Sequence, residues 1–265
     1  MSSFSLAGKT ALVTGGSRGI GRGLALGLAK SGADVVVLFR QAAEAADEVV
    51  AQIRDLGRRG FAVQHDIGNV DGIPAVVGAV HDEAGAIDIL VNNAGVAFLE
   101  PFHRVSQQTW DTTMNVNVKG PFFLAQELAR GMIERGRGGR IINISSTNGL
   151  QAEAHLAPYN ASKGALEMLT KSLAIDLSPY RITVNSVAPG LIETEIAEDF
   201  EVSGGFWEYL LEHIPLGRMG KPEDCIGAVV MLASEAGAYI TGQTIVVDGG
   251  ILCEQIPRLK FGEPQ

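Results

Sequence analysis

Short apolar runs alternate with segments of helical periodicity along most of the chain. An uninterrupted β-branched run such as Val35-Val36-Val37 is typical of a strand covered on both faces of a parallel sheet. Such runs predict strands at 9–14, 34–40, 60–65, 87–91, 140–145, 182–187 and 243–247. Apolar residues three and four positions apart predict helices at about 20–30, 42–56, 70–84, 106–135, 158–177 and 222–233. This alternation predicts one α/β domain over residues 1–265.

Three features depart from the alternation. Residues 195–220 are rich in aromatic side chains and predict a lid over a substrate, or alternatively a helical insertion that only packs on the surface. Residues 251–265 form a C-terminal tail after the last predicted strand. Asn115 and Asn117 interrupt the helix at 106–135, and asparagine is unfavourable inside a helix. We therefore expect one of the two to have a specific role, with a locally satisfied helix kink as the alternative.

Composition and charge narrow the class of protein. With 265 residues, 46% hydrophobic residues and 33 glycines, the chain can bury a large core with many tight turns. A formal net charge of −9 argues against nucleic acid or an anionic membrane as a partner. The two cysteines make no disulfide framework, and no apolar run reaches the roughly 18 residues of a membrane span. A soluble cytoplasmic protein that needs no metal is expected.

A glycine-rich loop between the first strand and the first helix predicts a phosphate site. Glycines let the backbone approach a pyrophosphate closely, and the helix N-terminus offers N–H groups and a positive dipole. The spacing is G-x-x-x-G-x-G rather than the standard dinucleotide fingerprint, and a simple turn is the alternative. The candidate cofactor residues of this loop are Gly15, Ser17, Arg18, Gly19, Ile20 and Gly21.

The end of the second strand bears on the choice of nucleotide. An acidic residue there would bind the ribose hydroxyls of NAD, whereas arginine can pair with the 2′-phosphate of NADP. This chain has Phe39 and Arg40, and Arg18 could close on the same phosphate. NADP(H) is therefore favoured, with NAD(H) as the alternative if both arginines are merely solvated. At the next strand end, Asp66, beside Ile67, could accept the adenine amino group or cap the following helix.

The candidate catalytic chemistry lies at the start of the helix at 158–177. Tyr159 and Lys163 are four residues apart and share one helix face, although such a pair is often just a solvated face. A neighbouring ammonium should lower the tyrosine pKa from about 10 toward the range useful for acid–base catalysis. Ser146 follows the strand at 140–145, and ligands bind beyond the carboxyl ends of parallel strands. We therefore expect its hydroxyl and the glycine loop to face one crevice.

Taken together, these segments resemble the short-chain dehydrogenase/reductase family over nearly the whole chain. The matching segments are Thr14-Gly15-Gly16-Ser17-Arg18-Gly19-Ile20-Gly21, Asn92-Asn93-Ala94-Gly95, Ser146, Tyr159 with Lys163, and Pro189-Gly190. The resemblance implies a doubly wound Rossmann-type fold with a seven-stranded parallel sheet, a nicotinamide cofactor and a homotetramer built through the two long helices. It also implies a catalytic tetrad of Asn117, Ser146, Tyr159 and Lys163.

The family pattern implies a role for each residue of the tetrad. Tyr159 would exchange a proton with the substrate oxygen while Ser146 stabilises the charge that develops on it. Lys163 would lower the tyrosine pKa and hold the nicotinamide ribose, and the Asn117 carbonyl would anchor a water, with Asn115 as the nearby alternative. Further cofactor contacts are implied for Asn93, Ala94, Gly95, Pro189, Gly190, Ile192 and Thr194.

The substrate stays open, because the pattern resembles both 3-oxoacyl carrier-protein reductases and bacterial sugar or polyol dehydrogenases. In either case we expect a small carbonyl or alcohol, and His155 could bind it or could be a plain surface histidine. An acidic carrier protein would need a local basic patch, which four arginines could form in space: Arg130, Arg135, Arg137 and Arg140. An epimerase or lyase on the same scaffold and a non-catalytic nucleotide-sensing protein are alternatives of other classes.

Overall fold

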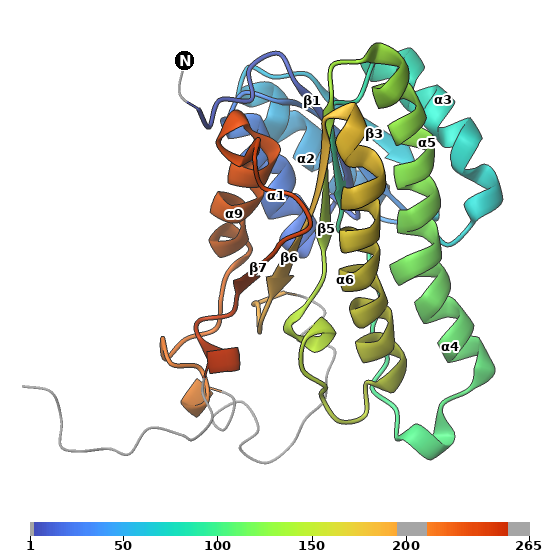
Figure 1. Ribbon diagram of the computed structural model, residues 1–265, viewed down its shortest axis with the longest axis vertical. Coiled ribbons are helices and arrows are strands. Elements are labelled where there is room, and N and C mark those ends of the chain that lie inside the picture. The colour runs from blue at the N-terminus through green and yellow to red at the C-terminus, as the bar shows by residue number, and fades with distance from the viewer. Residues whose placement is uncertain (1–2, 195–210, 254–265) are drawn as a thin grey trace, which may run out of the picture.

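A single parallel sheet runs through the molecule (Figure 1). The structure is a computed structural model that describes residues 3–194 and 211–253. Within these residues the sheet has seven strands in the order β3-β2-β1-β4-β5-β6-β7. The strands are β1 (Thr10–Thr14), β2 (Asp34–Phe39), β3 (Gly60–Gln64), β4 (Ile89–Asn92), β5 (Gly139–Ile144), β6 (Ile182–Pro189) and β7 (Thr244–Val247). The predicted doubly wound α/β domain is confirmed.

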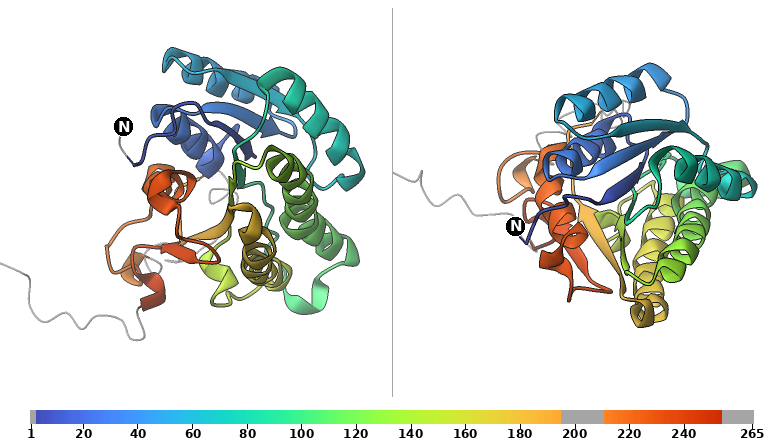
Figure 2. Two further views of the ribbon diagram at one scale, coloured as in Figure 1. Left: turned by 45° about the horizontal axis from the view of Figure 1, so that its top comes forward. Right: turned by 90° about the horizontal axis from the view of Figure 1, so that it is seen from above.

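Helices cover both faces of the sheet, as the two views of Figure 2 show. The helices are α1 (Gly19–Lys30), α2 (Ala43–Asp55), α3 (Ile73–Ala84), α4 (Gln107–Met114), α5 (Gly120–Arg135), α6 (Ala157–Leu177) and α9 (Ile226–Ala233). One hydrophobic core lies under α1, α2 and α9, and a second lies under α3, α5 and α6. Along β2, Val35 and Val37 point into the first core, whereas Val36 and Leu38 point into the second. Because alternate side chains of the strand enter different cores and both cores are apolar, every position from Val35 to Leu38 is apolar.

The helix predicted at 106–135 is divided where the two asparagines fall. A π-helical segment, Asn115–Lys119, joins α4 to α5. Single-turn π segments inside helices are frequent at functional sites. The predicted interruption is therefore real, and it changes the helical hydrogen-bonding pattern.

Two other predictions lie mainly outside the described residues. Residues 195–210 of the predicted lid and 254–265 of the predicted tail are not described. Gly220, at the end of the predicted lid, forms an isolated bridge with Ile192, and the tail begins with a short turn of 3-10 helix, Ile251–Cys253. In the described chain, no helix is long and apolar enough to cross a bilayer.

Buried polar side chains connect the centre of the sheet to α6. Asn92 Nδ2 donates to Asn143 Oδ1, at 2.9 Å, and Asn143 Nδ2 donates to the Thr170 hydroxyl at the same distance. These groups are almost fully buried, so leaving one partner unpaired would be costly. These hydrogen bonds fix how far along β5 the helix α6 lies. They thereby also position the residues at the N-terminal end of α6.

Candidate active site

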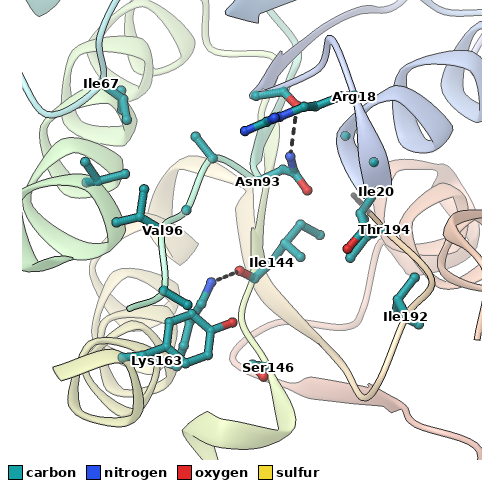
Figure 3. A pocket seen from close by; sticks show the side chains of 18 of the residues that line it. Arg18, Ile20, Ile67, Asn93, Val96, Ile144, Ser146, Lys163, Ile192 and Thr194 are labelled. Carbon is teal, nitrogen blue, oxygen red and sulfur yellow. Dashed lines mark hydrogen bonds between the residues drawn. The ribbon is translucent and has the colours of Figure 1, made fainter. Parts of the chain in front are cut away.

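A cavity of about 700 Å³ opens beyond the carboxyl ends of the strands. The reversal of strand order between β1 and β4 separates the loops that follow them, as expected for a ligand site of a doubly wound sheet. The cavity receives the glycine loop, the loops after β2 to β6 and the start of α6 (Figure 3). The predicted site residues that line it are Gly15, Ser17, Arg18, Gly19, Ile20, Gly21, Arg40, Asp66, Ile67, Asn93, Ala94, Gly95, Ser146, Tyr159, Lys163, Gly190, Ile192 and Thr194.

The glycine loop is folded too tightly to accept side chains. Gly15 and Gly19 have φ values of +62° and +51°, which L residues with a Cβ rarely adopt. A Cβ on Gly21 would lie 2.1 Å from the Gly15 carbonyl oxygen and 2.5 Å from Asn93 Nδ2. The loop therefore packs directly on the first turn of α1, and the N-terminus of α1 faces the cavity.

Hydrogen bonds tie this loop to the loop that follows β4. The Thr14 hydroxyl accepts from the backbone N–H groups of Asn93 and Ala94, both at 2.9 Å. Asn93 Nδ2 donates to the carbonyls of Thr14, at 3.0 Å, and Gly15, at 3.3 Å (Figure 3). The Asn93 side chain therefore stabilises the neighbouring glycine loop.

Two arginines line the part of the cavity formed by the ends of β1 and β2. Arg40 is exposed just after β2, and Arg18 directly precedes α1 with its side chain extended over the cavity in Figure 3. At the end of β3, Asp66 Oδ1 accepts from the Gly68 N–H at 2.9 Å. Part of that carboxylate thus closes a local turn, while Asp66 still lines the cavity.

Tyr159 and Lys163 meet on one face of α6, as their spacing predicts. Lys163 Nζ lies 5.5 Å from the centroid of the Tyr159 ring and donates to the Ile144 carbonyl at 2.9 Å (Figure 3). Ser146 lies two residues after the end of β5. Its hydroxyl donates to Asn148 Oδ1 and accepts from the Asn148 N–H, both at 3.1 Å. Three of the four predicted catalytic side chains, Ser146, Tyr159 and Lys163, therefore enter one cavity.

The electrostatics of this pair differ from the sequence-based expectation. Burial raises the pKa of Tyr159, hydrogen bonding with the Ser146 side chain lowers it, and the nearby Glu153 carboxylate raises it. Burial also lowers the pKa of Lys163 to about 8, against the opposing effect of Glu167. The expected fall in the tyrosine pKa is therefore wrong for this structure. The helical spacing places the ammonium correctly, but it does not reveal how strongly desolvation disfavours the phenolate.

Asn117 is buried in the π-helical segment behind the cavity rather than in its lining. Its Oδ1 accepts from the Val96 N–H at 2.8 Å, and its Nδ2 donates to the Val96 carbonyl at 2.9 Å and to the Ser162 hydroxyl at 3.0 Å. A Cβ on Gly95 would lie 3.4 Å from Asn117 Oδ1 and 3.6 Å from Lys163 Nζ. The side chain thus clamps the loop after β4 beside Lys163. The water-anchoring role of its carbonyl stays a prediction.

Besides Asn117, two predicted site residues do not line the cavity. His155 is exposed with φ +63°, and its carbonyl accepts from the Glu100 N–H at 2.9 Å. Pro189 ends β6, and the lining begins only with the next residue, Gly190. The loop that carries His155 instead places Glu153 at the cavity, together with Asn148. Neither Glu153 nor Asn148 was predicted from the sequence, although both are polar and lie between Ser146 and the start of α6.

The four arginines considered for a carrier-protein surface are largely occupied by acidic partners. Arg130 pairs with Glu127 at 2.6 Å, Arg135 lies 3.8 Å from Asp88, and Arg140 lies 3.3 Å from Glu235. Arg140 lies at the start of β5, the end of the sheet opposite the cavity. These contacts do not form a basic patch beside the site.

The fold and the site define a nicotinamide-dependent dehydrogenase. A family model described as enoyl-(acyl carrier protein) reductase matches residues 15–252, nearly the full length. The chain belongs to the short-chain dehydrogenase/reductase family, as its sequence motifs indicated. It is an oxidoreductase of the kind that acts on alcohol and carbonyl groups.

The relatives include gluconate dehydrogenases and 3-oxoacyl-[acyl-carrier-protein] reductases. The chain is 42% identical over 248 residues to gluconate 5-dehydrogenase of Gluconobacter oxydans, which covers 94% of this chain and 96% of the relative. It is 40% identical over 248 residues to a 3-oxoacyl-[acyl-carrier-protein] reductase of Synechocystis, covering 93% and 98%. A crystal structure of gluconate 5-dehydrogenase from Burkholderia cenocepacia with NADP and tartrate has a TM-score of 0.90 and 40% identity, covering 95% and 98%.

Proposed function

We propose that this enzyme interconverts a secondary alcohol and a ketone on a polyhydroxylated small molecule, using NADP(H). The observation that carries the reaction type is the meeting of Ser146, Tyr159 and Lys163 in the cavity that also receives the glycine loop. A polar wall beside Ser146, formed by Asn148 and Glu153, favours a substrate rich in hydroxyl groups. The similarity to sugar-acid dehydrogenases supports the same class.

The glycine loop fits a dinucleotide cofactor. Its backbone leaves no room for a Cβ at Gly21, and the helix N-terminus that follows suits a pyrophosphate. Arg18 and Arg40 would bind a 2′-phosphate, and NADP is present in the crystal structure of the Burkholderia relative. When bound, the nicotinamide supplies or accepts a hydride. The remaining residues proposed to hold it are Gly15, Ser17, Gly19, Ile20, Asp66, Ile67, Asn93, Ala94, Gly95, Tyr159, Lys163, Pro189, Gly190, Ile192 and Thr194.

The protein's own residues would supply the proton and stabilise the reacting oxygen. A raised pKa keeps Tyr159 protonated near neutrality, so the phenol can donate a proton to a substrate oxygen during reduction. Ser146 would turn its hydroxyl from Asn148 to that oxygen, where negative charge develops. The Lys163 ammonium, held by the Ile144 carbonyl, would stabilise the phenolate left behind. Oxidation reverses these steps.

A 3-oxoacyl thioester is the second candidate substrate, since a reductase of that kind is 40% identical to this chain. Apolar side chains of Val96, Leu99 and Leu156 line part of the cavity and could contact an acyl chain. Against it stand two of the arginines considered for a carrier-protein surface, because Arg130 pairs with Glu127 and Arg140 pairs with Glu235. An epimerase or lyase would convert substrate with no net change in cofactor absorbance, and a nucleotide sensor would show no turnover.

A substrate screen would test the proposal directly. Neutral polyols and aldoses, aldonates and 3-oxoacyl thioesters would be assayed with NADPH and NADP⁺, then with NADH and NAD⁺, at the absorbance of the reduced cofactor. We expect turnover of polyhydroxylated compounds with the phosphorylated cofactor, and its loss in Tyr159→Phe. Turnover of thioesters alone would select the second candidate, and no cofactor-coupled turnover of any compound would overturn the proposal.

We also propose a homotetramer in the cytoplasm. The outer surfaces of α4 to α6 expose large apolar side chains that a monomer would leave in water: Trp110, Phe123, Met168 and Ile175. Met168 and Ile175 are seven residues apart on α6, so they share one face. This face belongs to the long helices through which the family pattern predicts assembly. Light scattering and cell fractionation would test the two statements.

A further inference from the structure

A short hydrogen-bonded relay leads from the catalytic serine to a carboxylate at the cavity. The Ser146 hydroxyl donates to Asn148 Oδ1 at 3.1 Å, and Asn148 Nδ2 donates to Glu153 Oε2 at 3.2 Å. Glu153 lines the cavity, and its charge acts on the Tyr159 phenol. The carboxylate therefore lies on the side of the cavity where the reacting oxygen must bind.

The relay fixes the orientation of Asn148 and the loop that carries Glu153. Asn148 Nδ2 donates to Asn160 Oδ1 at 2.9 Å as well as to Glu153, so Asn148 must present its oxygen to Ser146. Asn160 Nδ2 in turn donates to the Glu153 backbone carbonyl at 2.8 Å. Side chain and backbone of Glu153 are thus both held from α6 and from the turn after β5. Within the described residues, Oε1 of this carboxylate accepts no hydrogen bond, so it is available to a ligand.

The charges around this end of the cavity are unbalanced. Besides Lys163, the cationic side chains of the described lining are Arg18 and Arg40, which follow β1 and β2, where the nucleotide is proposed to bind. Lys163 lies behind the Tyr159 ring with its ammonium on the Ile144 carbonyl. Near Ser146, therefore, the described lining offers a negative group to a substrate and no guanidinium that could receive a carboxylate.

We propose that Glu153 determines substrate specificity: it accepts a hydrogen bond from a hydroxyl of a neutral polyhydroxylated substrate and disfavours sugar acids. This inference rests on the proposed function and narrows its substrate class. Glu153 is solvent-exposed, yet a carboxylate held beside it would still meet a like charge, which is unfavourable, whereas a substrate hydroxyl would donate a hydrogen bond to Oε1. The chain would then differ in specificity from relatives named for gluconate, which is itself a carboxylate.

The test compares matched neutral and anionic substrates in the wild type and in Glu153→Gln. Polyols or aldoses are paired with the aldonates of the same configuration, and kcat/KM is measured for each member with NADP⁺. We expect the wild type to prefer the neutral member by roughly tenfold or more, and Glu153→Gln to reduce that ratio by roughly tenfold. The change should appear mainly in KM for the aldonate, since the amide removes the repulsion.

Glu235→Gln is the matched control, because it removes one carboxylate near the start of β5, at the opposite end of the sheet. It should leave the ratio unchanged, while NADPH affinity and the thermal midpoint show that both variants are folded. A wild type that prefers the aldonate, or a ratio unaltered by Glu153→Gln, would overturn the role of Glu153 alone. Absence of turnover with every compound, thioesters included, would overturn the proposed function and this inference with it.

Discussion

At the scale of single residues, burial is the largest influence on the catalytic groups. It raises the pKa of the Tyr159 phenol and lowers that of the Lys163 ammonium to about 8, so it disfavours the charged form of each. A neutral phenol beside a cation is well suited to give a proton to a ketone. In the oxidative direction, proton loss from the phenol has to be assisted by the ammonium and the Ser146 hydroxyl.

The Tyr159 phenol is expected to be essential for turnover and dispensable for the fold. Replacing it with Phe removes only the hydroxyl, so we expect kcat to fall by about 10² or more while NADPH affinity stays within a factor of about two. Steady-state kinetics and fluorescence titration with NADPH would measure the two quantities. Near-normal turnover of the variant would contradict the proposed proton transfer.

We expect Arg40 to bind the 2′-phosphate of NADP(H) and thereby to favour NADP(H) over NAD(H). Arg40→Asp replaces a cation with an anion at the end of β2, so affinity for NADPH should fall by at least roughly tenfold while affinity for NADH changes little. Lys30→Glu makes the same change in charge at the far end of α1 and serves as the control, because it leaves the cavity untouched. Equal losses for both cofactors in Arg40→Asp would show that Arg40 does not distinguish them.

The sequence predicts which residues enter the cavity better than it predicts their surroundings. Tyr159, Lys163 and Ser146 follow from helical spacing and from the end of a parallel strand, and the structure brings them together. His155 lies in an irregular loop with a left-handed backbone, where neither period applies, and it is not among the residues that line the cavity. Glu153, two residues earlier, enters the cavity instead, because its position depends on hydrogen bonds to Asn148 and Asn160.

At the scale of elements, α6 carries a second buried charge one turn beyond Lys163. Glu167 accepts from the Ser186 hydroxyl at 2.8 Å and from the Thr244 hydroxyl, which connects α6 to β6 and β7. Its carboxylate raises the pKa of Lys163 against the effect of burial. The helix thus links the charge state of the catalytic lysine to the packing of the last two strands.

Glu167→Gln should move the pH dependence of the enzyme. If reduction requires the Lys163 ammonium, kcat/KM should fall as the pH rises through about 8. Removing the carboxylate removes the influence that raises the lysine pKa, so this alkaline limb should shift to lower pH. Kinetics across pH 6 to 10 would show the shift; a limb unchanged in a folded variant would mean that Glu167 does not act on Lys163.

The positions of most strands and helices could be predicted from the sequence. Strands of a sheet that is buried on both faces are apolar along most of their length, and helices show apolar residues three and four positions apart. The seven strands and the main helices lie within a few residues of their predicted limits. The π-helical segment was detectable only as an interruption, since Asn117 is explained by contacts with Val96 and Ser162, far away in sequence. Propensity could show that an asparagine is out of place there, but not what its amide would bind.

At the scale of the whole molecule, the two faces of the sheet have different outer surfaces. On the face covered by α3, α5 and α6, the apolar side chains of Met168 and Ile175 are 61% and 75% exposed. In a monomer this apolar stripe would contact water, whereas a partner subunit would bury it. Assembly would also hold α6 rigidly, and α6 carries both Tyr159 and Lys163.

Met168→Glu should therefore dissociate the proposed tetramer. The wild type is expected to scatter light with about four times the 27.9 kDa mass of one chain, and a charge on the outer face of α6 should shift it to a smaller species. Leu56→Glu, at an exposed leucine just after α2 on the other face, is the matched control and should leave the mass unchanged. A monomeric wild type would contradict the assembly, and an unshifted Met168→Glu would move the interface away from α6. If dissociation also lowers kcat while NADPH still binds, the long helices hold the catalytic geometry as well as the subunits.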